Sequence, residues 1–107
     1  MPSTPHNPWA GEVALVVDGQ AIACKLTLGA LAELEASLGE DTLVALVKRF
    51  EAGRFSTRDV LALIVAGLRG GGWRGTSADL MQADIEGGIL KAAEAAAELL
   101  ARAFATP

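Results

Sequence analysis

A two-residue Asp18-Gly19 link between two stretches of alternating apolar residues restricts the fold of this chain more than any other feature. Alternation places every second side chain of a strand on one face, so residues 11–17 and 20–26 are predicted to be half-buried strands. An Asp-Gly link favours the type I′ turn, whose positive φ angles match the strand twist. The apolar face of this hairpin comprises Val13, Leu15, Val17, Ile22, Cys24 and Leu26. Because two strands alone are marginally stable in water, helices must cover this face.

The next stretch, LTLGALAELEASLG at residues 26–39, has leucines spaced by three and four positions, which predicts an amphipathic helix. Thr27 is the expected N-cap, and Gly39 can adopt the left-handed conformation that ends a helix. The expected apolar stripe consists of Leu28, Leu31, Leu34 and Leu38. We expect this helix to cover the two strands.

Two further helices are predicted before the run of three glycines at residues 70–72. Asp41 or Thr42 caps the first, which ends at Gly53 and turns Leu43, Leu46, Val47 and Phe50 inward. Ser56 and Asp59 have the spacing of a capping box at the start of the second. Its apolar residues, Val60, Leu61, Ile64, Val65 and Leu68, leave little polar surface. Such a helix is expected at the centre of a bundle.

The C-terminal third is predicted to form a short helix around residues 78–86, capped by Thr76 or Ser77, and an alanine-rich helix at residues 89–104. The expected inward side of the last helix comprises Leu90, Ala93, Ala97, Leu100 and Phe104. The predicted fold is therefore mainly α with an N-terminal β-hairpin (α+β), with about five helices packed over two strands. A single domain is expected at residues 11–105, after a disordered lead-in at residues 1–10.

Composition excludes several classes of protein. The longest apolar run, Val60 to Leu68, is far shorter than the ~20 residues of a membrane-spanning helix. The N-terminus MPSTPHNPW lacks both the cationic start and the apolar core of a signal peptide. We therefore expect a cytoplasmic protein that does not enter a membrane.

No residue constellation has the types and spacing of an active site. Cys24 is the only cysteine and His6 the only histidine, so an intrachain disulfide, a zinc site and a catalytic triad cannot be assembled. Glu33 and Glu35 are the nearest carboxylate pair, but on a helix they lie about 200° apart. The glycines at 70–72 follow a helix and lack the Gly-Lys-Ser/Thr ending of a phosphate-binding loop. We expect no catalysis, metal, cofactor or small-molecule substrate.

Charge is unevenly distributed along the chain. Residues 48–74 carry six basic and two acidic side chains, although the whole chain has a net charge of −4. The basic residues are Lys48, Arg49, Arg54, Arg58, Arg69 and Arg74. A net acidic chain without interleaved aromatic residues binds phosphates poorly, so a solvated or salt-bridged face is expected rather than a nucleic-acid interface.

The order of elements then permits a comparison with known families. A hairpin, LTLGALAELEASLG, a helix ending in AGRFSTRDVLALIVAGLRGGG, a short helix and an alanine-rich terminal helix follow one another. In this order the chain resembles the tail assembly chaperones of phages and gene transfer agents, a family in which some members are described as tail tube proteins. The resemblance extends from Gly11 to about Phe104 and is most specific at residues 30–39 and 59–72.

The resemblance implies a non-catalytic protein that coats the long, helical tape measure protein before the tail tube polymerises around it. Tail tube subunits are rich in β-structure, so a chain with one predicted hairpin favours the chaperone role. The implied partners are the tape measure protein, tail tube subunits or both, and self-association is left open. The alternatives are a structural tail component retained in the particle and a generic helical adaptor or nucleic-acid-binding module.

Four large apolar residues are candidate partner contacts: Phe55, Trp73, Leu99 and Phe104. They lie near predicted helix ends and flexible glycines, where large apolar groups often serve as anchors. Packing in the core is the alternative interpretation for Leu99 and Phe104, and applies equally to Trp73.

Overall fold

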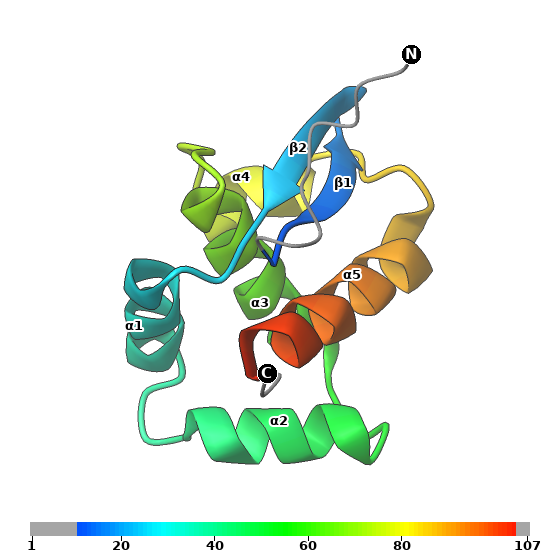
Figure 1. Ribbon diagram of the computed structural model, residues 1–107. Helices are drawn as coiled ribbons and strands as arrows, with labels where there is room; N and C mark the ends of the chain where they lie inside the picture. The colour runs from blue at the N-terminus through cyan, green and yellow to red at the C-terminus, as the bar shows by residue number, and fades with distance from the viewer. Residues whose placement is uncertain (1–10, 105–107) are drawn as a thin grey trace.

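The computed structural model describes residues 11–104 as a two-stranded hairpin followed by five helices (Figure 1). The elements are β1 (Val13–Val17), β2 (Gln20–Cys24), α1 (Leu28–Ser37), α2 (Leu43–Glu51), α3 (Thr57–Gly70), α4 (Ser77–Gln82) and α5 (Gly88–Phe104). This order confirms the predicted mainly helical α+β class. The predicted disordered lead-in at residues 1–10 and the domain end at residue 105 lie outside the described residues.

The hairpin has the predicted turn. β1 and β2 pair antiparallel from Val13 opposite Cys24 to Val17 opposite Gln20, which leaves Asp18 and Gly19 as the two-residue link. Their φ angles are 51° and 78°, so both residues adopt the positive φ of a type I′ turn.

Four helices begin at the side-chain caps that the sequence predicts. The hydroxyl oxygens of Thr27 and Thr42 accept hydrogen bonds from the backbone three residues later, at the starts of α1 and α2. Ser56 forms a reciprocal capping box with Asp59 at the start of α3, and Thr76 forms one with Asp79 at the start of α4. Each cap satisfies backbone N–H groups that a helix start otherwise leaves unpaired.

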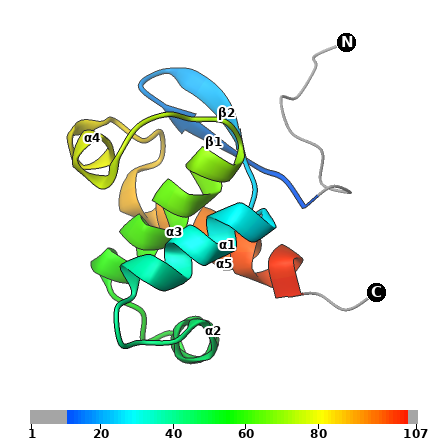
Figure 2. The same cartoon turned by 90° about the vertical axis from the view of Figure 1, so that its left-hand side faces the viewer.

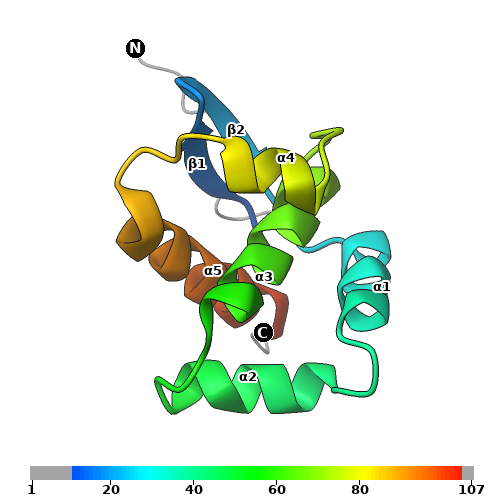
Figure 3. The same cartoon turned by 180° about the vertical axis from the view of Figure 1, so that it is seen from behind.

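Helix α3 lies at the centre of the fold, as its apolar sequence predicts, and packs against α1, α4, α5 and β2 (Figures 2 and 3). Its C-terminal glycines permit close contact with the hairpin, because a Cβ at Gly70 or Gly71 would overlap the carbonyl oxygens of Lys25 and Ala23 respectively. The sequence indicated only a helix stop there. The surrounding core includes Leu15, Cys24, Leu34, Leu46, Leu63, Ile64, Leu68, Ala96 and Leu99.

Helix α2 crosses one end of the bundle (Figure 1). Leu46 is its only fully buried residue, and Leu43, Val47 and Phe50 pack partly buried against the core, as predicted. Arg49 of α2 forms ion pairs with α3 and with the segment before α2. Its guanidinium donates to both carboxylate oxygens of Asp59 at 2.9 Å and lies 2.8 Å from the carboxylate of Asp41.

The predicted helix at residues 78–86 is too long. Helix α4 ends at Gln82, and the next residues run extended beside β1, where Val17 forms an isolated bridge with Ile85. Asp18 N donates to Asp84 O at 2.7 Å, and Glu86 N donates to Val16 O at 3.0 Å. The backbone groups of residues 84–86 thus find hydrogen-bond partners on the outer edge of β1. In a longer helix the same groups would have to pair within the helix itself.

The predicted inward side of the last helix is correct at Leu100, which is buried, and at Ala93, which packs partly buried against the core. It is wrong at Leu90, Ala97 and Phe104, which are exposed. The buried residues of α5 are Ala92, Ala95, Ala96, Leu99 and Leu100, whereas Leu90 is 76% exposed. Alanines occur on every side of this helix, so its periodicity does not specify which side packs. Its close crossing of α3 decides the side instead, because a Cβ at Gly67 would lie 2.6 Å from Leu99 Cδ1.

The expectation that α1 covers the two strands is wrong, because α1 packs mainly on α3, and it is α3 and α5 that pack against the strands. The leucine stripe of α1 is correct in part. Leu34 is buried, and Leu31 and Leu38 are packed partly buried against the core, but Leu28 is 85% exposed. Leu28 is the first residue of the helix, and the buried residue of that turn is Ala30. A small side chain there permits α1 to approach the end of α3, since Ala30 Cβ is among the atoms nearest to Gly70.

Candidate partner-binding grooves

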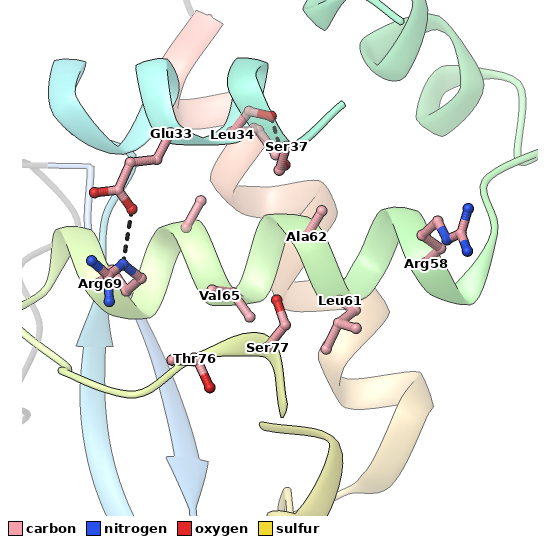
Figure 4. A pocket seen from close by; sticks show the side chains of 11 residues that line it. Glu33, Leu34, Ser37, Arg58, Leu61, Ala62, Val65, Arg69, Thr76 and Ser77 are labelled. Atoms are coloured by element: carbon pink, nitrogen blue, oxygen red, sulfur yellow. Dashed lines mark hydrogen bonds and ion pairs between the residues drawn. The ribbon is translucent and has the colours of Figure 1, made fainter. Parts of the chain in front are cut away.

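An open groove of about 520 Å³ runs along α3, between α1 on one side and the start of α4 on the other (Figure 4). We call it the α1–α3 groove. Its lining residues are Glu33, Leu34, Ser37, Arg58, Leu61, Ala62, Val65, Ala66, Arg69, Thr76 and Ser77. The floor is apolar, and the charged residues lie toward its ends.

A single stripe of α3 forms this floor. Leu61, Ala62 and Val65 are partly buried, and they recur at the spacing that places side chains on one face of a helix. In Figure 4, Ala62 projects toward α1, while Leu61 and Val65 project toward Ser77. The opposite side of α3, which includes Leu63 and Ile64, is buried in the core. The groove is therefore an apolar stripe that neighbouring helices flank but do not cover.

At the end of the groove near the C-terminus of α3, Arg69 forms hydrogen bonds to both flanking elements. Its Nε donates to Glu33 Oε1 at 2.8 Å, and its Nη1 donates to the carbonyl oxygen of Gly75 at 3.0 Å. The hydrogen bond from Arg69 lowers the pKa of the Glu33 carboxyl group, and the same bond raises the pKa of Arg69. One guanidinium thus connects α1, α3 and the segment before α4.

Arg58 lies at the other end, in the first turn of α3. It is exposed and, within residues 11–104, forms no ion pair. The Asp59 carboxylate already offsets the α3 dipole at this helix start, so the free charge here is that of the Arg58 side chain alone. The two ends of the groove therefore differ: one has a neutralised ion pair and the other an uncompensated positive charge.

A second groove, of about 340 Å³, lies between α2 and α5, and we call it the α2–α5 groove. It is lined by Val47, Phe50, Glu51, Ala97, Leu100, Ala101 and Phe104. Phe55 stacks on Phe50 with ring centroids 4.4 Å apart and planes inclined by 7°. Of the four candidate contacts, Phe104 lines this groove and is 47% exposed, while Phe55 is 37% exposed and reaches the groove only through its stacking on Phe50.

The other two candidates lie elsewhere. Leu99 is 1% exposed and packs in the core, so it cannot touch a partner unless the core opens. Trp73 is partly buried against the core beyond the C-terminus of α3. The structure therefore gathers only part of the predicted set, and the partner role of Phe55, Phe104 and Trp73 stays a prediction.

The basic segment does not form one continuous cationic face. Arg49 and Arg69 are engaged in ion pairs, with Asp41 and Asp59 for the first and Glu33 for the second. Among the described residues no cluster of three or more His, Cys, Asp or Glu side chains could hold a metal ion. Within the same residues no helix is both long and apolar enough to cross a membrane.

Comparison with known families decides the class of protein. A family model described as phage tail tube protein, GTA-gp10, matches residues 10–106. The chain belongs to this phage tail family. No curated protein and no solved structure matches it. The resemblance to phage and gene transfer agent tail proteins is thereby confirmed, while the chaperone designation within this tail family stays a prediction.

The sequence contained a signal for the α1–α3 groove that our interpretation did not use. Helix α3 is apolar on nearly every side and carries Arg58 and Arg69 near its two ends. The excess of apolar residues predicts burial on more than one side, at the centre of the bundle. In the structure one stripe of this helix faces an open groove instead.

Proposed function

We propose that this tail family member is a tail assembly chaperone, which binds helical segments of the tape measure protein in the cytoplasm of the bacterial host. The observation that carries the proposal is the α1–α3 groove, an elongated apolar surface about as long as three helical turns. An amphipathic helix binds to such a groove through side chains at positions i, i+3, i+4 and i+7. This role requires no catalytic group.

The architecture also supports the proposal. The only sheet of the described residues has two strands, while tail tube subunits are rich in β-structure. A groove of this size contacts only a short stretch of helix, and small interfaces are typical of transient complexes. Weak binding suits a chaperone that polymerising tube subunits must displace.

A retained tail tube component is the second candidate, because the family description names a tail tube protein. The two candidates differ in the composition of finished particles. A tube subunit is present in stoichiometric amount relative to other tail proteins, whereas a chaperone is nearly absent. Quantitative mass spectrometry of purified particles distinguishes them.

Co-expression tests the chaperone role directly. The tape measure protein of the same phage or gene transfer agent is expressed alone and together with this chain carrying an affinity tag. We expect its soluble fraction to rise and the two proteins to co-purify. An unrelated long helical protein serves as the control for nonspecific capture. If solubility does not change and no complex is recovered, the chaperone role is refuted.

A further inference from the structure

We infer that the α1–α3 groove binds a single amphipathic helix of the tape measure protein, aligned so that an acidic side chain of that helix lies beside Arg58. This inference rests on the proposed chaperone function and adds the surface, the conformation of the occupant and its register. It follows from the shape of the groove, the stripe that forms its floor and the charges at its ends.

The floor has the geometry of a helix-packing face that lacks its partner. From Arg58 to Arg69 the stripe extends about 16 Å along α3, at 1.5 Å per residue. Leu61, Ala62 and Val65 present ridges of the kind that pack into the grooves of a second helix. The small side chain of Ala62 permits a close approach at the centre of this stripe.

The walls keep the floor accessible. Arg69 fixes α1, through Glu33, and the segment before α4, through Gly75. These two hydrogen bonds hold the flanking elements on either side of α3 at one end of the groove, while the end beside Arg58 is without such a bridge among the described residues. A helix can therefore lie along the floor with one end extending past Arg58.

Charge determines the register. The charge of Arg69 is neutralised by Glu33, whereas Arg58, among the described residues, has no ion-pair partner and is the free positive charge of the groove. A carboxylate in the occupant is favoured there, and a lysine or arginine is repelled. In a chain of net charge −4 this local positive end distinguishes acidic from basic partner segments.

The test compares tagged variants in the co-expression experiment with the tape measure protein. Val65→Glu introduces a carboxylate into the floor, and we expect recovery of the tape measure protein to fall by at least about tenfold, as for a central apolar anchor. Arg58→Glu reverses the charge at the open end, and we expect a fall of about three- to tenfold. A glutamate in the first turn of α3 is favourable for the helix, so this variant is expected to fold.

Matched controls lie on α5, which packs on a different side of α3. Leu90→Glu introduces a carboxylate at a residue that is 76% exposed, and Lys91→Glu reverses an exposed charge near a helix start. Both are expected to recover the tape measure protein as well as the unaltered chain does. Thermal unfolding followed by circular dichroism verifies that all four variants are folded.

A photo-crosslinker attached to Ala62→Cys gives an independent readout. Burial raises the pKa of the native Cys24 thiol to about 12, so the introduced cysteine is the reactive one. We expect crosslinks to the apolar face of a tape measure helix, with an acidic residue about one turn away toward Arg58. Crosslinks between two copies of this chain, without any to the tape measure protein, would overturn the inference in favour of a self-association surface.

The outcomes separate the two proposals. If the unaltered chain recovers no tape measure protein, the chaperone function fails and the groove assignment fails with it. If the unaltered chain recovers the tape measure protein and the two groove variants recover it equally well, the function stands and the groove assignment is refuted. Loss in the groove variants alone supports both.

Discussion

Asp59 is expected to contribute more to the free energy of unfolding than any other residue that caps a helix in this chain. Its side chain is 10% exposed, and its carboxylate accepts hydrogen bonds from the backbone N–H of Ser56 at 3.0 Å and from two nitrogens of Arg49 at 2.9 Å each. It therefore completes the capping box of α3 and, through Arg49, attaches α2 to the bundle. Asp59→Ala removes all of these hydrogen bonds at once.

The magnitude follows from two contributions. Loss of a cap costs about 1 kcal/mol, and breaking a largely buried ion pair costs roughly 3–5 kcal/mol when the remaining charge is left without a partner. Arg49 keeps Asp41 at 2.8 Å and is 30% exposed, so the low end applies. We expect a total loss of about 4 kcal/mol, which corresponds to a fall in Tm of about 20 °C for a chain of this size.

The second capping box of the chain provides the control. Thr76 and Asp79 form the same reciprocal pair at the start of α4, but both are exposed and no arginine joins them among the described residues. Asp79→Ala is expected to cost only about 0.5–1 kcal/mol. Urea unfolding followed by circular dichroism at several pH values measures both variants. Equal losses for Asp59→Ala and Asp79→Ala would refute the role assigned to Arg49.

The pH dependence has a definite sign. The hydrogen bond from Arg49 lowers the pKa of Asp59, so the folded state binds its proton less tightly than the unfolded state does. The stabilisation is therefore fully present above the unfolded pKa of about 3.9 and is lost as the pH falls toward the folded pKa. Asp59→Asn is expected to flatten the stability profile below about pH 5. A profile as steep as that of the unaltered chain would contradict this reasoning.

The remaining predictions concern close packing, the thiol and the tryptophan. Gly71→Ala is expected to destabilise the chain by about 1–3 kcal/mol in urea unfolding, because its Cβ would overlap the Ala23 carbonyl oxygen. Gly29→Ala, in a helix where the added Cβ would be in ordinary contact with Thr27 Oγ1 at 3.9 Å, is expected to stabilise by about 0.5 kcal/mol, and a loss there would contradict the packing argument. Cys24, with its pKa raised to about 12 by burial, is expected to resist thiol reagents at pH 8 until urea unfolds the chain, and rapid native-state labelling would disprove its burial. Trp73→Ala is expected to lower stability, and unchanged recovery of the tape measure protein would remove Trp73 from the partner contacts.

Local features of the fold could be predicted from the sequence, while those that depend on distant segments could not. The Asp18-Gly19 turn and the Thr27 cap depend on φ preferences and hydroxyl geometry within a few residues. The end of α4 at Gln82 depends on hydrogen bonds to β1, which lies more than sixty residues earlier in the chain. No local pattern encodes such a pairing.

The candidate grooves were predictable to an even smaller extent. Phe50 and Phe104 line one groove because α2 and α5 flank it, and no local pattern in the sequence indicates that α2 and α5 lie on either side of one groove. The size of Leu99 makes it a candidate contact, but the structure buries it. In an alanine-rich helix the sequence does not specify which side packs, and a shift of one position exchanges the exposed and the buried residues. The stripe at Leu61 and Val65 was visible in the sequence, yet its exposure depends on how far apart α1 and α4 lie.

The short extended segment after α4 has a consequence for assembly. A ring grown by strand addition requires each subunit to offer two different open edges, because head-to-tail contacts join unlike surfaces. Within residues 11–104, backbone groups of Asp84 and Glu86 already occupy part of the outer edge of β1. The end of α3 lies against the Ala23 carbonyl oxygen of β2, so close that a Cβ at Gly71 would overlap it. A tube built from this fold must therefore either displace these segments from the two strands or polymerise through its helices.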